Sequence, residues 1–178
     1  MRLDWQMPPT SEDFVTALSN FSSTREKVLE HKFVAEISSC LWARGIFDFA
    51  VARSEVDNSG YDLIMEVHSV VRHVQLKASH TLGKTRDVGI QVRLARKPSG
   101  CVVWMVHDAR TLAVENLLWF GAAAGNALPD LGDKIVKHTK ADMQKHKGLR
   151  PALREVAKSR FVQVATWQDL TDRLFAPG

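Results

Sequence analysis

A continuous apolar run at residues 101–107, CVVWMVH, is the feature that most constrains the fold of this chain. The run is too short to cross a bilayer, and its β-branched and aromatic side chains favour a strand. A strand without polar alternation is typical of the centre of a sheet, where both faces are covered. The sequence therefore predicts a sheet with this strand buried inside it.

Helical and strand-like patterns surround this run. We predict a short helix at residues 11–20 with Ser11 as its cap, and a longer helix at about residues 24–44 that ends at Gly45. Residues 46–53, 61–67, 70–78 and 112–120 are predicted strands, and residues 151–159 and 167–175 are predicted helices. Residues 87–97 remain open between a strand, which their alternation favours, and a helix.

Length and composition indicate a single domain over residues 1–178, because 45% of the residues are hydrophobic and no linker or repeat interrupts them. The two cysteines, Cys40 and Cys101, form no metal-ligand or disulfide pattern. The first residues lack the apolar stretch of a signal peptide, and the longest uncharged run, residues 116–129, is too short for a membrane span. We therefore expect a cytoplasmic protein without a membrane partner.

Basic residues are concentrated near the end of the chain. Residues 131–160 carry nine Lys and Arg against three Asp and Glu, whereas the whole chain has 24 against 20. Lysine and arginine that neutralise phosphates release counterions, so this segment suits a nucleic-acid partner. A solvated surface is the alternative. The residues that we assign to nucleic-acid binding are Lys134, Lys137, Lys140, Lys145, Lys147 and Arg150.

Polar side chains capable of chemistry interrupt two of the predicted strands. Asp62 lies at the start of one strand, and Gln75 and Lys77 lie two positions apart on the next. Residues two apart on a strand point to the same face, so Gln75 and Lys77 can converge on one site beside Asp62. Oxygen ligands suit Mg²⁺, and an adjacent lysine can hold or polarise an attacking water. The pattern indicates hydrolysis of phosphodiesters.

The spacing of Asp62 and Gln75-Leu76-Lys77, after a helix that carries glutamate and a strand, resembles the PD-(D/E)xK nuclease superfamily in its QxK variant. The resemblance covers about residues 24–107. It implies a restriction-endonuclease-like α/β fold, with an αβββαβ core and a mixed central sheet flanked by helices. It also implies Mg²⁺ (or Mn²⁺) bound by Asp62, Gln75 and the Leu76 carbonyl, and Lys77 as the catalytic lysine. Tyr61 replaces the proline of the motif.

The superfamily also places a glutamate on the first helix, and Glu30 and Glu36 both qualify. At about 100° per residue, the apolar positions of the helix define a face within which Glu30 falls, whereas Glu36 falls at its edge. An acid among core positions is costly unless it is paired or binds a cation. We therefore predict Glu30 as the catalytic and metal-binding glutamate and keep Glu36 as the alternative metal ligand.

These observations lead to the hypothesis of a metal-dependent endonuclease that hydrolyses phosphodiester bonds, with DNA as the expected substrate. The catalytic set is Glu30, Asp62, Gln75 and Lys77. Many nucleases of this superfamily act as dimers, so a homodimer also remains open. Gln75 keeps an alternative function open, because an amide binds Mg²⁺ less strongly than a carboxylate. That alternative is an inactive nuclease-fold protein that binds nucleic acid or a protein partner.

Overall fold

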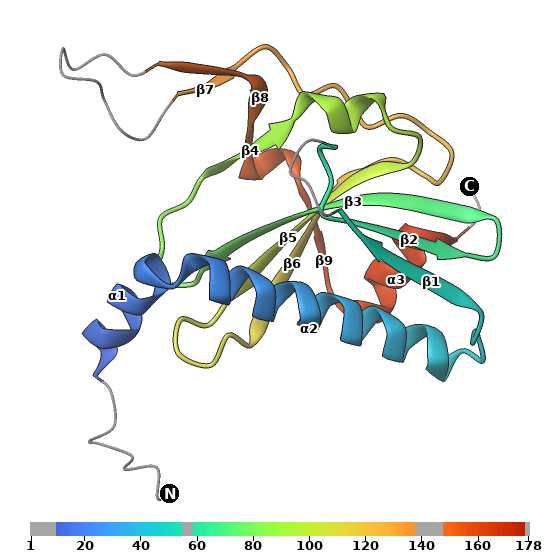
Figure 1. Cartoon of the computed structure of the whole chain (residues 1–178), viewed down its shortest axis with the longest axis horizontal. Coiled ribbons are helices and arrows are strands. Elements are labelled where there is room, and N and C mark those ends of the chain that lie inside the picture. Colours follow the sequence, from blue (N-terminus) through green and yellow to red (C-terminus); the bar gives the residue numbers. More distant parts are fainter. Residues whose placement is uncertain (1–9, 55–58, 138–147, 177–178) are drawn as a thin grey trace, which may run out of the picture.

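The computed structural model describes residues 10–54, 59–137 and 148–176. Over these residues the chain has a mixed α/β architecture with three α-helices and two sheets (Figure 1). The elements are, in chain order, α1 (Ser11–Asn20), α2 (Ser22–Ala43), β1 (Phe49–Arg53), β2 (Leu63–Val67), β3 (Val70–His80), β4 (Asp87–Gln91), the 3₁₀ helix η1 (Val92–Arg96), β5 (Gly100–His107), β6 (Val114–Gly121), β7 (Ile135–Lys137), β8 (Leu149–Ala157), the 3₁₀ helix η2 (Lys158–Arg160), β9 (Val162–Val164) and α3 (Trp167–Phe175).

The larger sheet has six strands in the order β1-β2-β3-β5-β6-β9, and β5 is buried along its whole length. This confirms the prediction of a central buried strand. Strand β5 runs parallel to β3 and antiparallel to β6, and the other neighbours in this sheet are antiparallel. The sheet is therefore mixed. The four other strands predicted before residue 121 correspond to β1, β2, β3 and β6, with ends shifted by up to three residues.

The connection between the parallel strands β3 and β5 differs from the expected core. The resemblance implies an α-helix here, but this segment forms β4 and η1. Val88 and Ile90 alternate with polar or small residues, as a strand requires, and β4 pairs antiparallel with β8. The strand alternative for residues 87–97 is thus correct for its first half. The αβββαβ pattern is wrong at its second helix.

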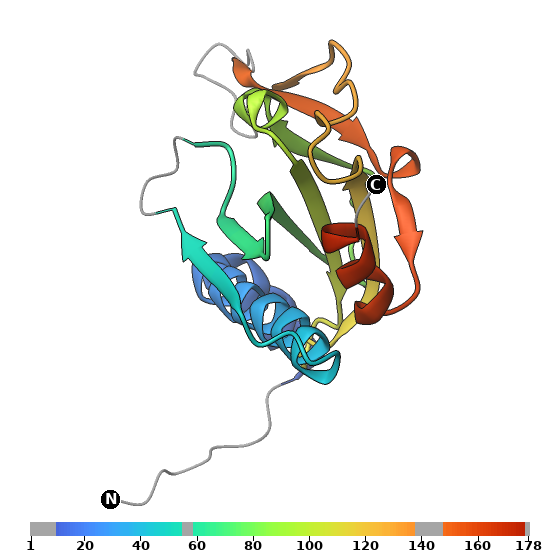
Figure 2. The same ribbon diagram turned by 90° about the vertical axis from the view of Figure 1, so that its right-hand side faces the viewer.

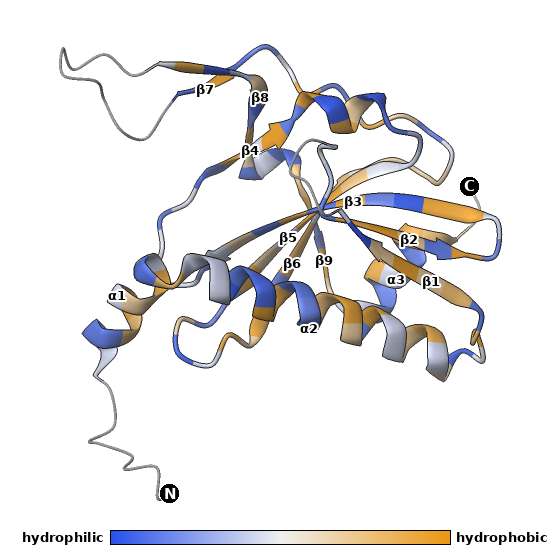
Figure 3. Ribbon diagram, viewed as in Figure 1, coloured by the Kyte–Doolittle hydropathy of each residue, from blue (hydrophilic) through white to orange (hydrophobic). Residues whose placement is uncertain are grey.

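Helices α2 and α3 cover one face of the larger sheet (Figure 2). The predicted apolar face of α2 is confirmed, because Leu29, Phe33, Ile37 and Leu41 are no more than 1% exposed. Polar and apolar residues alternate along α2 in Figure 3, as expected of a helix with one buried side. Gly45 follows the helix with a positive φ of 74°, the backbone conformation that favours glycine at a helix end.

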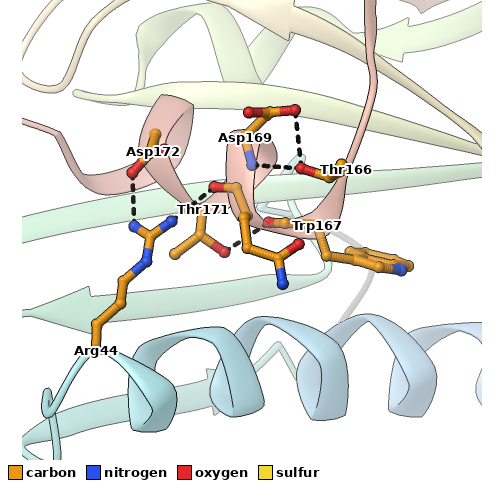
Figure 4. A network of polar contacts seen from close by, with 7 residues as sticks. Arg44, Thr166, Trp167, Asp169, Thr171 and Asp172 are labelled. Carbon is orange, nitrogen blue, oxygen red and sulfur yellow. Dashed lines mark hydrogen bonds and ion pairs between the residues drawn. The ribbon is translucent and has the colours of Figure 1, made fainter.

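Polar contacts stabilise the start of α1 and the end of α2. The N-cap of α1 is Thr10, whose hydroxyl accepts a hydrogen bond from the Asp13 amide, so the prediction of Ser11 as cap is wrong by one residue. At the other end, Arg44 pairs with Asp172 of α3, with Nη1 and Oδ1 2.6 Å apart (Figure 4). Its Nη2 donates to the Gln168 carbonyl at 3.0 Å. These contacts join the end of α2 to α3.

The opposite face of the sheet packs against a second apolar cluster that includes Leu94 of η1, Val156 of β8 and Phe161. The three-stranded sheet β4-β8-β7 thus takes the place of a second helical layer. The prediction of a helix at residues 151–159 is wrong, because most of this segment forms β8. The last predicted helix is confirmed as α3. In the described part of the chain, no helix is long and apolar enough to cross a membrane.

Candidate active site

The pairing of strands β2 and β3 ends next to Asp62, one of the predicted site residues. Their register ends where Leu63 lies opposite Val74, and Asp62 lies just before this point. The Asp62 amide donates to the Val74 carbonyl at 2.9 Å, and its carboxylate Oδ2 accepts the Leu76 amide at 2.6 Å. The carboxylate therefore replaces a backbone partner beyond the end of β2. This holds Asp62 beside residues 75–77.

A cavity of about 520 Å³ opens at this place, between α2, β3 and β8. It brings together five of the predicted catalytic and metal-binding residues: Glu30, Asp62, Gln75, Leu76 and Lys77. The other candidate, Glu36, is exposed and does not line the cavity. The helical geometry thus ranked the two glutamates correctly with respect to burial and position.

Glu30 enters the cavity wall from the buried side of α2. Its side chain is 10% exposed, and its two carboxylate oxygens are paired separately, with Lys27 Nζ at 2.8 Å and Arg53 Nε at 2.6 Å. Burial opposes the charged carboxylate and would raise its pKa, but the hydrogen bonds and charges of Lys27 and Arg53 outweigh burial. The pKa of Glu30 therefore lies below its ordinary value, and Glu30 is ionised at neutral pH.

Gln75 is buried at 4% exposure, and its side-chain oxygen accepts the Gln91 amide of β4 at 3.3 Å. Gln75 and Lys77 alternate along β3 with Leu76 and Ala78, which pack against the core cluster beneath α2. Ser79, next in this alternation, accepts a hydrogen bond from the Trp104 indole at 2.9 Å. Its hydroxyl is thus used in packing β3 against β5.

Of the residues assigned to nucleic-acid binding, Arg150 of β8 is among those that line the cavity. Lys134 is exposed but forms an ion pair with Glu155, which raises the pKa of Lys134, and Lys137 is exposed at the end of β7. Lys140, Lys145 and Lys147 lie outside the described residues. Beyond the predicted set, Arg160 donates to the carbonyl of Leu131, so part of the charge of the basic segment serves the fold.

The oxygen atoms around Asp62 suit one hard divalent cation. The described residues contain no group of three or more His, Cys, Asp or Glu side chains that could hold a metal. Because Lys27 and Arg53 engage both oxygens of Glu30, the predicted helix ligand, a cation here would depend on the Asp62 carboxylate, the Gln75 amide oxygen and the Leu76 carbonyl. Mg²⁺ commonly binds proteins through one or two carboxylates and keeps several waters, so this donor set fits it.

Three residues at the site, Lys27, Arg53 and Gln91, were not among the predicted site residues. Lys27 precedes Glu30 by three positions on the same helix, and side chains at this spacing lie next to each other. This spacing could have identified Lys27 from the sequence. Arg53 and Gln91 reach the site only through tertiary contacts, across 23 and 16 residues respectively. No local pattern identifies either of them.

Comparison of the chain with protein-family models, curated proteins and solved structures returned no match.

Proposed function

We propose that the protein is a metal-dependent nuclease that hydrolyses phosphodiester bonds, with DNA as the expected substrate. The observation that carries this proposal is one shared cavity. It is lined by Glu30 of α2, by Asp62 just before β2, and by Gln75, Leu76 and Lys77 of β3. An acid, a second oxygen donor and a lysine beside one polar cavity suit attack of water on a phosphodiester.

We propose a restriction-endonuclease-like fold on related grounds. Helix α2 precedes an antiparallel β1-β2-β3 meander, and β3 then pairs parallel with β5. This order agrees with the implied core up to the crossover, where β4 and η1 occupy the place of its second helix. The candidate residues lie at the divergence of β2 and β3, within the part of the core that agrees.

In this proposal Asp62, Gln75 and the Leu76 carbonyl would hold Mg²⁺ or Mn²⁺. When bound, the cation lowers the pKa of a coordinated water and neutralises charge on the phosphate. Asp62 stays fixed by its hydrogen bond from the Leu76 amide. The Lys77 ammonium would stabilise the negative charge that develops on the phosphate oxygens as the water oxygen bonds to phosphorus and the bond to the leaving oxygen breaks. The attacking water would lose a proton to solvent, and the leaving oxygen would take one from solvent.

The test is a cleavage assay on supercoiled plasmid and single-stranded DNA with Mg²⁺ or Mn²⁺, with EDTA as the metal-free control. Asp62→Asn removes the charge but keeps an oxygen that can accept the Leu76 amide, and Lys77→Ala removes the ammonium. Wild type should cut the DNA, and neither variant should. Glu115→Gln, an exposed change outside the cavity, should cut normally. Absence of metal-dependent cutting by folded wild-type protein would reject the nuclease function.

Two observations favour a second candidate, a nuclease-fold protein that binds nucleic acid without cutting it. Gln75 supplies a neutral ligand, and both oxygens of Glu30 are engaged by cations. These contacts weaken the attraction of the site for a metal. Binding of nucleic acid by wild type, without cleavage under any metal condition, would support this second candidate.

A further inference from the structure

Cationic side chains line the cavity from opposite sides. Lys27 comes from the first half of α2, and Arg150 comes from the start of β8. Figure 1 shows α2 below the central strands and β8 above them. Lys77 lines the cavity between the two, from β3. A polyanionic chain that enters the cavity therefore meets positive charge on both sides.

The ion pairs of Glu30 hold two cationic side chains in position on the α2 side of the site. The Glu30 side chain is 10% exposed, whereas those of Lys27 and Arg53 are 66% and 48% exposed. One buried carboxylate thus fixes two accessible cations, which lose less conformational freedom when a phosphate binds. The three side chains together carry a charge of +1, so they still attract an anion.

The size and lining of the cavity indicate how much of a nucleic acid can enter. A volume of about 520 Å³ lies in the range of pockets that hold one small molecule. The partly exposed apolar side chains of Leu76 and Ala78 line it beside the partly exposed Gln91. These surfaces suit the sugar and base of a nucleotide. In a duplex the bases are stacked and paired, so they reach such a surface only from an unpaired strand.

We propose that the cavity binds a single nucleic-acid strand, with phosphates held by Lys27 on the α2 side and by Arg150 on the β8 side. This inference rests on the proposed function and names its substrate class. A strand between α2 and β8 lies directly over β3 and brings a phosphodiester to Lys77 and Asp62. The second strand of an intact duplex would meet the walls of the cavity.

Binding can be tested without metal, and so without catalysis. Fluorescence anisotropy in EDTA would measure the affinity of the full chain for a short labelled strand, and for that strand annealed to its complement, over a range of salt concentrations. We expect the single strand to bind about tenfold more tightly or better. Lys27→Gln and Arg150→Gln should each weaken binding and reduce the slope of log affinity against log salt by about 0.7. Arg173→Gln, an exposed change on α3, is the matched control and should leave both values unchanged.

Equal or tighter binding of the duplex would overturn the inference, as would wild-type affinity and slope in both cavity variants. The cleavage assay separates this failure from failure of the nuclease function. Metal-dependent cutting of plasmid and single strands at equal rates would leave a nuclease without strand preference. Selective binding of the single strand without cutting would keep the strand-binding cavity and reject the nuclease.

Discussion

Gln75 is the residue at which the proposed site departs most from a strong cation site. It is buried beside Asp62 and offers an amide oxygen where a carboxylate would attract Mg²⁺ more strongly. Gln75→Glu keeps the side-chain length and an oxygen that can accept the Gln91 amide. The new carboxylate is costly in a buried position unless a cation compensates it. We therefore expect lower thermal stability in EDTA, recovery with Mg²⁺ or Mn²⁺, and faster cleavage than in wild type.

Thermal denaturation with and without metal, alongside the cleavage assay, would measure these effects. Gln163→Glu makes the same chemical change at an exposed position of β9 and should show no metal-dependent recovery. Loss of stability in the Gln75 variant that no divalent metal restores would contradict a cation site at Asp62 and Gln75.

The ionisation of Glu30 makes the stability of the fold depend on pH in the acid range. The pKa of Glu30 is lowered in the folded state because Lys27 and Arg53 outweigh the effect of burial. The ionised form thus stabilises the fold above the ordinary glutamate pKa, and this stabilisation is lost as the pH falls through the lowered value. Glu30→Gln should reduce stability at neutral pH and flatten the acid limb of the stability profile. Urea denaturation from neutral pH to about pH 3 would measure both changes. An acid limb as steep as that of wild type would contradict the assignment.

At the scale of elements, the turn before β2 positions Asp62 through a close contact with η1. Gly60 has a φ of 83°, and a Cβ atom there would lie 2.9 Å from the Leu94 backbone nitrogen. Gly125 has nearly the same φ, 85°, but open space around it. Gly60→Ala should therefore cost more than Gly125→Ala, which carries only the backbone strain of about 1 kcal/mol. We expect a difference of about 1–2 kcal/mol in the free energy of unfolding, measured by urea denaturation. Equal losses would show that η1 moves aside without cost.

Which elements the sequence predicts depends on how far local preference agrees with tertiary contacts. Helix α2 and strand β5 follow from the sequence because most of their buried positions are apolar, at helical spacing in α2 and as a continuous run in β5. Strand β8 does not, because Ala152, Leu153, Arg154 and Glu155 are good helix formers. Its pairing with β4 and β7 overrides this preference. Pairing between distant segments leaves no local pattern in the sequence.

The same limit applies to the candidate site. Asp62, Gln75 and Lys77 lie on or next to two strands joined by a short turn, so alternation alone predicts that they meet. The pairing of Glu30 with Arg53 depends on how α2 packs against β1, and only the folded molecule contains this contact. The sequence therefore predicts the chemical groups on the strands better than their electrostatic surroundings.

For the whole molecule, the buried cysteine of β5 reports how the central sheet opens. Cys101 is fully buried, and burial raises its pKa to about 12, although the charge of Arg72 partly opposes this rise. The thiolate is the reactive form, so Cys101 should resist alkylation in the folded protein. Its strand lies between β3 and β6, and we expect it to become accessible only when the sheet unfolds as a unit. Alkylation followed by peptide mass spectrometry would measure Cys101 separately from Cys40.

Destabilised variants make this prediction quantitative. If Cys101 reacts only from the unfolded state, Gly60→Ala should accelerate its alkylation by the factor that it adds to the unfolding equilibrium constant, about tenfold for each 1.4 kcal/mol lost. Gly125→Ala should accelerate it by its own smaller factor. Neither variant changes a residue of β5 itself, so a common relation between rate and stability would identify unfolding of the whole sheet. Alkylation rates that do not change with the free energy of unfolding would instead show that β5 opens locally, at the centre of the larger sheet, without unfolding of the whole sheet.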